Sequence, residues 1–187
     1  MKVIKTSVKG VLIIEPPVFK DRRGFFMETY RQNRYREYGT DRVFVQDNLS
    51  FSVQGTLRGL HFQVRHPQAK LVQVMTGEIF DVAVDIRPGS PTFGKWTGAY
   101  LNEENRRQLF VPEGFAHGFC VLSETALFSY KCSDYYAPDD DGGILWSDPD
   151  LGIDWPVKEV IVSDKDGKLP CLSELLPEQL YSPENKP

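Results

Sequence analysis

The chain has 187 residues, of which 41% are hydrophobic and 26% are charged. Both fractions are close to globular averages, so an intrinsically disordered chain is excluded, and the length suits one domain spanning residues 1–187. The formal net charge of −4 provides no general basic surface for nucleic acid, so any anionic ligand has to be met by a local group of Arg and Lys.

Most of the chain is predicted to form β-strands, because Val, Ile, Phe and Tyr recur in short runs that turn residues separate. The predicted strands are 11–15, 24–30, 42–53, 56–63, 70–87, 95–101, 107–111, 115–122 and 126–136. Within 70–87, Gly77 can supply the positive φ of a tight turn, which predicts a hairpin. In the second arm Asp81 and Asp85 alternate with apolar residues, which predicts a strand with one face in water.

Helix signals are weak. Residues 31–38 are expected to form a short helix that ends at Gly39, and 173–180 another that Pro177 interrupts. Residues 137–170 are predicted to form loops packed on the sheets, with a C-terminal tail at about 164–187. Closely spaced strands without long helices between them favour an all-β antiparallel sandwich or barrel.

Two strand segments combine polar and apolar residues in ways that suggest a site. Alternation places Gln46 and Asn48 on the face of Phe44, where a ligand could pair with their amides; solvated strand residues are the alternative. Alternation also places Arg58 and His61 on opposite faces. Because a glycine within a strand often marks a bulge, Gly59 could bring the two to one site. A single strand histidine is otherwise more often a core residue.

A third segment places His117 among apolar neighbours, so we expect it to face the interior and to have a hydrogen-bond partner there. The following strand carries Tyr130 and Tyr136 on one face. On a straight strand they would lie roughly 20 Å apart and could serve the two ends of an elongated ligand. Ordinary core aromatics are the alternative.

A metal site is not expected. Cupin metal sites use a His-x-His pair, but the sequence here reads His61-Phe62-Gln63, and Gln is a poor ligand for zinc or iron. The second cupin motif, Pro112-x-Gly114-x-x-His117, is present, so the barrel is expected without its metal. The chain has no nucleophile elbow, phosphate-binding loop or dinucleotide-binding glycine pattern.

Several segments together resemble the dTDP-4-dehydrorhamnose 3,5-epimerase family, in order along nearly the whole chain. The matching segments are 21–28 (DRRGFFME), 44–48 (FVQDN), 57–63 (LRGLHFQ), 67–72 (PQAKLV), 77–85 (GEIFDVAVD), 111–119 (VPEGFAHGF) and 148–156 (DPDLGIDWP). The resemblance implies a cupin-like antiparallel jelly-roll barrel with short peripheral helices. It further implies a homodimer without metal or cofactor, acting on a dTDP-linked 4-keto-6-deoxy sugar.

The resemblance also implies roles for individual residues. His61 matches the catalytic base, Asp166 the carboxylate that orients it, Tyr130 the proton donor on the opposite side, and Lys70 the cation beside the developing enolate. Tyr136 matches the residue that stacks on thymine, and Asp141 stands where the family often has Glu. The positions that line the sugar and diphosphate are matched by Arg23, Glu28, Gln46, Asp47, Asn48, Arg58 and His117.

The implied reaction is the removal and return of the protons at C3 and C5 of dTDP-4-dehydro-6-deoxy-D-glucose, which gives dTDP-4-dehydro-L-rhamnose. Relatives that invert one carbon or move the ketone would share the scaffold, and a metal-dependent cupin oxygenase and a non-catalytic sugar-nucleotide binding module are more distant alternatives. No apolar run approaches the roughly 20 residues of a membrane span. The start of the chain lacks a signal peptide and the three cysteines are widely spaced, so we expect a cytoplasmic protein.

Overall fold

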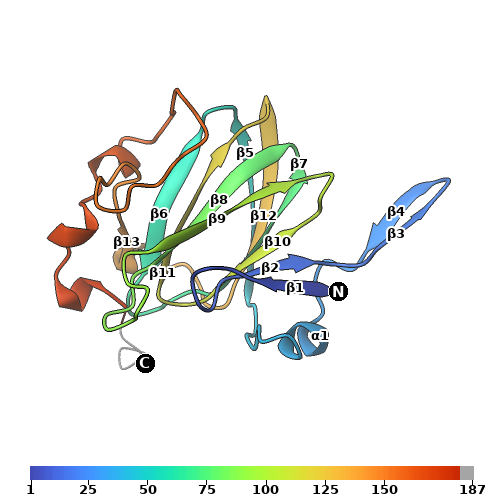
Figure 1. Ribbon diagram of the computed structural model, residues 1–187, viewed down its shortest axis with the longest axis horizontal. Coiled ribbons are helices and arrows are strands. Elements are labelled where there is room, and N and C mark those ends of the chain that lie inside the picture. Colours follow the sequence, from blue (N-terminus) through green and yellow to red (C-terminus); the bar gives the residue numbers. More distant parts are fainter. Residues whose placement is uncertain (182–187) are drawn as a thin grey trace.

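The structure, a computed structural model, describes residues 1–181 and consists mainly of two β-sheets packed face to face (Figure 1). The six-stranded sheet has the order β1 (Lys2–Lys5), β2 (Leu12–Glu15), β10 (Gln108–Val111), β7 (Lys70–Thr76), β12 (Thr125–Cys132) and β5 (Gln46–Val53). The five-stranded sheet has the order β13 (Asp141–Gly143), β6 (Leu57–Gln63), β11 (Phe115–Val121), β8 (Glu78–Asp85) and β9 (Trp96–Asn102).

The remaining elements lie at the periphery. Strands β3 (Val18–Asp21) and β4 (Gly24–Met27) form a hairpin that projects from the barrel at the right of Figure 1, and α1 (Gln32–Arg36) lies below it. Four short 3-10 turns follow the last long strand: η1 (Pro138–Asp140), η2 (Asp166–Lys168), η3 (Leu172–Glu174) and η4 (Pro177–Gln179). No helix in residues 1–181 is both long and apolar enough to cross a membrane.

Every pairing between these strands of the described chain is antiparallel. The predicted all-β antiparallel jelly-roll with short peripheral helices is therefore confirmed. The interior between the sheets is apolar, with Val72 and Phe128 of the six-stranded sheet packed in one cluster with Ala83, Phe119 and Val121 of the five-stranded sheet. Burial of this surface is the main stabilising contribution to the barrel.

The hairpin predicted over 70–87 is wrong. Gly77 does adopt a positive φ of 84°, but β7 belongs to the six-stranded sheet and β8 to the five-stranded sheet, so the chain crosses between sheets there. A side chain at Gly77 would also collide with the backbone, because an added Cβ would lie 2.2 Å from the carbonyl oxygen of Thr125.

The prediction of a half-solvated second arm is also wrong. Asp81 and Asp85 are fully buried, because both faces of β8 are covered: the face that carries Asp81 and Ala83 lies against the opposite sheet, and the face that carries Val82 and Val84 lies against the segment after β13. Leu151, Leu172 and Leu180 of this segment pack with Val82 and Val84 in a second apolar cluster. In the predicted C-terminal tail, Leu172 and Leu180 therefore lie against the five-stranded sheet, and the end of that tail, 182–187, lies outside the described residues.

Other predicted elements differ mainly at their ends. Strand 42–53 begins only at Gln46, strand 126–136 ends at Cys132, strand 24–30 ends at Met27, and helix 31–38 is reduced to α1. The helix predicted over 173–180 is replaced by η3 and η4, because Pro177 cannot donate within a continuous helix. Strands β1, β3 and β13, of three or four residues each, were not predicted.

Candidate functional site

Two cavities meet between the sheets. The larger, of about 610 Å³, is lined by Arg58 and His61 of β6, His117 and Phe119 of β11, and Lys70, Phe128 and Tyr130 of the opposite sheet, together with residues 161–166. The smaller, of about 330 Å³, is lined by Gln46, Asn48, Cys132, Tyr136 and Asp141 among others. His61, Lys70 and Tyr130 border both cavities, so they mark the point where the two meet.

Gly59 brings Arg58 and His61 to the same cavity, as the bulge prediction required. The pairing of β6 with β11 shifts register between His117 and Phe119, opposite this glycine. Gly59 has a φ of 126°, and an added Cβ would lie 2.6 Å from the Cα of Gly118. A glycine is therefore required at this position, both for the φ angle and for the close approach of the two strands.

His61 and Asp166 form a dyad. The Nε2 atom of His61 lies 2.8 Å from Oδ1 of Asp166, and the Gly59 N–H donates to Oδ2 at 3.2 Å. Burial alone would raise the pKa of Asp166, but the hydrogen bond and charge of His61, with the Gly59 N–H, outweigh it and leave this pKa lowered. Asp166 is therefore an ionised acceptor, which fixes the proton of His61 on Nε2 and leaves Nδ1 able to accept one.

Tyr130 and Lys70 border the cavity from the sheet opposite His61. They lie on the paired strands β12 and β7, with Tyr130 next to Val72 and Lys70 next to Cys132 in register. Burial raises the pKa of the Tyr130 phenol, which keeps it protonated at neutral pH. Burial lowers the pKa of Lys70, which makes its ammonium a better proton donor than a solvated lysine.

His117 faces the interior and has the hydrogen-bond partner that the sequence required. Its Nε2 lies 2.9 Å from Oδ1 of Asp81, which comes from the adjacent strand β8. Burial raises the pKa of Asp81. Its second oxygen, Oδ2, has no hydrogen-bond partner within the described chain. Asp81 was missed as a site residue because alternation assigned it to a solvent-exposed face.

Gln46 and Asn48 point toward the smaller cavity, as alternation predicted, and the Nε2 of Gln46 donates to the Oδ1 of Asn48 at 3.1 Å. Phe44 lies before the strand and packs edge-on against Tyr30 instead. Asp47 points away from both cavities and pairs with Lys131 at 2.9 Å. Because side chains alternate between the two faces of β5, Asp47 lies on the face opposite Gln46 and Asn48, and the sequence could have indicated its direction.

Tyr136 does not continue the line of Tyr130, because β12 ends at Cys132 and the chain turns. The straight strand on which the spacing of roughly 20 Å was based therefore does not extend to Tyr136. Tyr136 borders the smaller cavity, and its hydroxyl donates to Oδ2 of Asp141 at 3.0 Å. The same carboxylate oxygen accepts a hydrogen bond from the ammonium of Lys165. Lys165 borders the larger cavity and was not singled out in the sequence, although it directly precedes Asp166.

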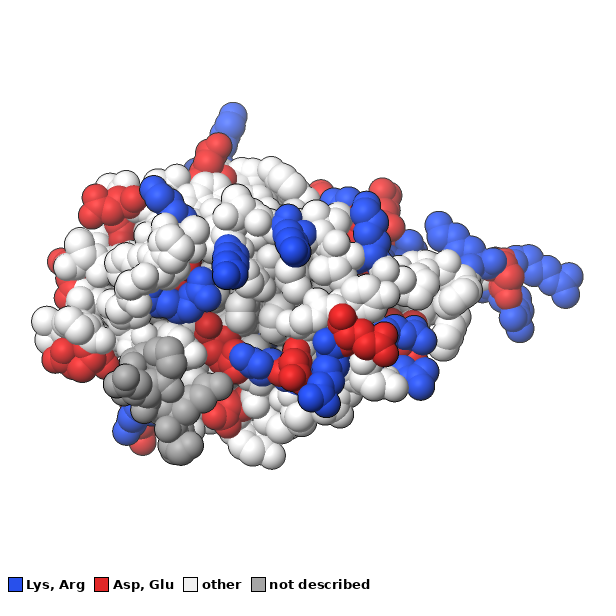
Figure 2. Space-filling view, turned by 60° about the horizontal axis from the view of Figure 1, so that its bottom comes forward, with Lys and Arg blue, Asp and Glu red and all other residues white. Residues whose placement is uncertain are grey.

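Arg23 and Glu28 are not brought to either cavity of their own chain. Arg23 lies at the tip of the β3–β4 hairpin and pairs with Asp21 at 2.6 Å, with both side chains exposed. Glu28 follows the hairpin and pairs with Arg34 of α1 at 2.9 Å. Figure 2 shows Lys and Arg gathered at this tip, to which Lys20, Arg22 and Arg23 belong.

The sequence predicts no metal site at the position of the cupin motifs. Within residues 1–181 no group of three or more His, Cys, Asp or Glu side chains is arranged to hold a metal ion. Gln63, at the place of the second cupin histidine, uses its amide on backbone groups of residues 66, 135 and 137.

Comparison with known proteins identifies the family. The family described as dTDP-4-dehydrorhamnose 3,5-epimerase matches residues 5–174. The dTDP-4-dehydrorhamnose 3,5-epimerase of Methanothermobacter thermautotrophicus is 56% identical over 168 residues, which cover 88% of this chain and 91% of that protein. The chain belongs to the dTDP-4-dehydrorhamnose 3,5-epimerase family. The resemblance predicted from the sequence motifs is thus confirmed.

Solved structures of the epimerase family superpose closely on this chain. The dTDP-6-deoxy-D-glucose-3,5-epimerase of Legionella pneumophila, in complex with dTDP-4-keto-L-rhamnose, has a TM-score of 0.94 and 50% identity. The alignment covers 96% of this chain and 97% of the Legionella chain. The 3'-monoepimerase ChmJ of Streptomyces bikiniensis, in complex with dTDP-quinovose, has a TM-score of 0.88 and 34% identity, with 96% and 93% covered. The epimerase barrel therefore supports both double and single inversion.

Proposed function

We propose that this epimerase inverts C3 and C5 of dTDP-4-dehydro-6-deoxy-D-glucose to give dTDP-4-dehydro-L-rhamnose, as a step of dTDP-rhamnose biosynthesis. The observation that carries the proposal is the placement of the His61–Asp166 dyad and Tyr130 on opposite sheets around one cavity. An epimerase requires a base on one face of the sugar and a proton donor on the other. Double inversion is preferred because the relative at 56% identity is a 3,5-epimerase, whereas the monoepimerase is 34% identical.

The base in this proposal is Nδ1 of His61. The carbons C3 and C5 flank the C4 ketone, so loss of either proton gives an enolate stabilised by that carbonyl. Nδ1 takes the proton, and the ring becomes an imidazolium. The carboxylate of Asp166, which accepts the Nε2–H at 2.8 Å, stabilises this imidazolium. Asp166 itself stays ionised, which its lowered pKa favours.

Lys70 and Tyr130 complete the proton transfer. As the C4 oxygen becomes negative, the Lys70 ammonium donates a hydrogen bond to it, an interaction commonly worth about 3–4 kcal/mol in comparable oxyanion sites. Tyr130 then donates its phenolic proton to the carbon from the face opposite His61, which inverts the centre. The resulting phenolate recovers a proton from solvent, and the base releases the proton it took.

The remaining cavity residues are proposed to hold the nucleotide. The diphosphate requires local cations on a protein with a net charge of −4, and Arg58 and Lys165 border the larger cavity. Gln46, Asn48 and His117 offer hydrogen bonds to the sugar. The half-exposed ring of Tyr136 offers a stacking surface for the pyrimidine, with Asp141 holding its hydroxyl.

We also propose a homodimer in which Arg23 and Glu28 reach the cavity of the second copy. The support comes from two exposed apolar surfaces. On β5, the outermost strand of its sheet, Leu49, Phe51 and Val53 are 65%, 62% and 50% exposed. The β3–β4 hairpin exposes Phe19, Phe25 and Phe26 as well. An unpaired strand edge with a stripe of large apolar residues is typical of an interface.

A cytoplasmic location is part of the proposal. Cys120, Cys132 and Cys171 are all free thiols, and the first two are buried in the barrel. Unpaired cysteines of this kind are typical of a reducing compartment.

Incubation with the keto-sugar nucleotide in heavy water, followed by NMR, tests the reaction. Deuterium is expected at both C3 and C5; deuterium at one carbon would show a monoepimerase, and its absence would refute the epimerase proposal. Movement of the ketone would show an isomerase. Turnover is expected to be unchanged by a chelator, whereas loss of activity would favour a metal-dependent cupin oxygenase. His61→Ala is expected to abolish exchange at both carbons.

A further inference from the structure

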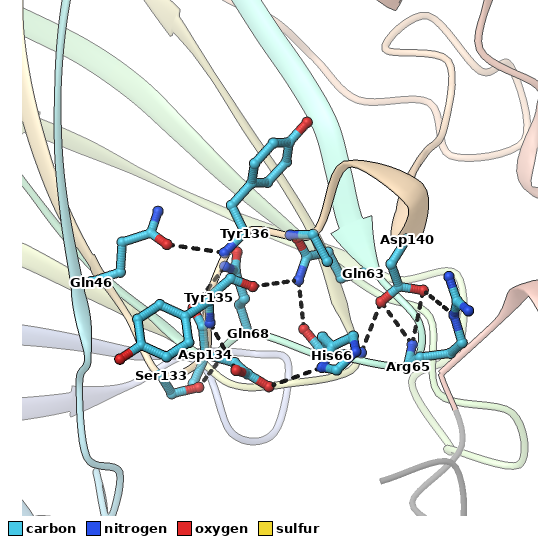
Figure 3. Close-up of polar contacts among 12 residues, drawn as sticks. Gln46, Gln63, Arg65, His66, Gln68, Ser133, Asp134, Tyr135, Tyr136 and Asp140 are labelled. Carbon is cyan, nitrogen blue, oxygen red and sulfur yellow. Dashed lines mark hydrogen bonds and ion pairs between the residues drawn. The ribbon is translucent and has the colours of Figure 1, made fainter. Parts of the chain in front are cut away.

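The segment that carries Tyr136 is held by glutamine side chains instead of by strand pairing. After β12 ends at Cys132, the backbone of residues 134–137 leaves the sheet, and three glutamines bind its polar groups (Figure 3). We call these residues, Gln46, Gln63 and Gln68, the amide clamp. Since buried or half-buried backbone groups need partners, the clamp replaces the hydrogen bonds that the strand would have supplied.

The clamp binds four consecutive residues. Gln68 Nε2 donates to the carbonyl of Asp134 at 2.9 Å, and Gln63 Nε2 donates to the carbonyl of Tyr135 at 3.2 Å. The Tyr136 N–H donates to Gln46 Oε1, and the Ala137 N–H donates to Gln63 Oε1, each at 2.9 Å. The backbone on both sides of Tyr136 is therefore fixed.

Gln63 is the central member of the clamp. Its side chain is buried, with 5% of its surface exposed, and its amide binds both neighbours of Tyr136. Its second N–H donates to the carbonyl of His66 at 2.7 Å, so both amide protons are used within the chain.

The loop that receives this third bond is itself anchored. The carboxylate of Asp140, a buried residue, accepts the backbone N–H groups of Arg65 at 2.9 Å and of His66 at 2.8 Å. Burial raises the pKa of Asp140, but the bonds from His66 and Arg65 outweigh it and the pKa is lowered. Gln63 thus joins two rigid parts, the loop after β6 and the segment of Tyr136.

We propose that Gln63 is a positioning residue for the Tyr136 ring, and that through this ring it determines the affinity for the nucleoside end of the substrate. The inference rests on the proposed role of Tyr136 in stacking on the base. Tyr136 is 52% exposed, and within residues 1–181 its hydroxyl bonds only to Asp141, so the direction of its ring depends on its backbone. A clamp that fixes this backbone before the ligand arrives lowers the entropy lost on binding.

A double-mutant cycle tests the proposal. Affinity for dTDP is measured by calorimetry for the unmodified chain, Gln63→Met, Tyr136→Ala and the double variant. We expect Gln63→Met to weaken binding about fivefold and Tyr136→Ala about tenfold. The double variant is expected to bind no more weakly than Tyr136→Ala alone, because Gln63 acts through the ring.

Kinetics and a matched control separate positioning from general destabilisation. For Gln63→Met, KM for the keto-sugar nucleotide is expected to rise about fivefold while kcat changes less than about twofold. Gln108 is the control, since it is a buried glutamine with equally complete hydrogen bonds, to Thr29, Gln73 and Tyr35, outside both cavities. Gln108→Leu is expected to lower thermal stability without changing KM.

The outcomes are distinguishable. Additive losses in the cycle would mean that Gln63 contacts the ligand directly, since it also borders the smaller cavity, and would overturn the proposal. An equal rise in KM for Gln108→Leu would overturn it too. If Gln63→Met does not fold, Gln63→Asn keeps the amide but is one methylene too short, and the same loss of affinity is expected. Failure of the unmodified chain to bind dTDP would refute the proposed function itself.

Discussion

Replacing Asp166 by Asn removes a negative charge from the dyad while keeping an oxygen of similar position. In the neutral state His61 can still donate its Nε2–H to the amide oxygen. The amide NH2 then replaces the oxygen that accepts the Gly59 N–H, a loss that lowers stability and that thermal unfolding measures separately from kcat. In the proton-transfer step the imidazolium loses its counter-ion at 2.8 Å. The variant therefore isolates the electrostatic contribution of Asp166 to catalysis.

The expected magnitude follows from the geometry. With the two charges centred roughly 4 Å apart, their attraction is about 4 kcal/mol at an effective dielectric constant of 20. The Asp166 side chain is 6% exposed and that of His61 32%, so solvent screens the pair only in part. An allowance for this screening leaves about 3–4 kcal/mol, which corresponds to a roughly 100- to 1000-fold fall in kcat.

The assay is NMR detection of deuterium entering C3 and C5 of the keto-sugar nucleotide, with thermal unfolding as the check on folding. Asp164→Asn is the matched control, because it makes the same change two residues away on an exposed side chain. It is expected to keep full turnover. Asp166→Asn with kcat within about threefold of the unmodified enzyme would refute the reasoning, since Asp166 would then not stabilise the imidazolium.

Three further predictions follow from the site and the proposed dimer. Tyr130→Phe is expected to retain some deuterium exchange but to lose at least about 100-fold in inverted product. Because burial raises the pKa of Tyr130, ionisation of this phenol in the unmodified enzyme should cause no loss of kcat below pH 10. Lys70→Met is expected to raise the melting temperature while reducing kcat. In the unmodified enzyme the pKa of Lys70 is lowered in the folded state, so the unfolded chain binds more protons and stability rises with pH from that lowered pKa to about 10.4. Lys70→Met should reduce this dependence of stability on pH. Phe51→Asp is expected to convert the dimer to a monomer in light scattering with loss of activity, and a dimeric, active variant would contradict the proposed interface.

The dyad and its bulge illustrate what the sequence could predict. The family resemblance predicted a base at His61, which the structure places on the cavity beside Asp166, and Gly59 correctly indicated the irregularity that brings Arg58 to the same cavity. The bulge depends only on neighbouring residues and so can be inferred from the chain order alone, whereas His61 and Asp166, 105 residues apart, were linked by the resemblance to the family.

Features that depend on distant segments were predicted poorly. Alternation in β8 indicated a solvent-exposed face for Asp81, because nothing in that strand records that one of its faces lies against the opposite sheet and the other against the C-terminal segment. The turn at Gly77 was recognised, but its conformation is equally compatible with a hairpin and with a crossing between sheets. The position of Arg23 depends on a second chain in the proposed dimer, which the sequence of one chain does not place.

The pairing of His61 with a carboxylate 105 residues later has a consequence for biosynthesis of the enzyme. While the ribosome is still making residues before Asp166, every long strand of both sheets has already been translated, but the nascent barrel does not yet contain the carboxylate that the proposed mechanism pairs with His61. Asp166 is translated last, together with the segment that covers the outer face of the five-stranded sheet. Under the proposed mechanism, a truncated chain released early is therefore expected to be inactive as well as exposed to aggregation through its uncovered five-stranded sheet.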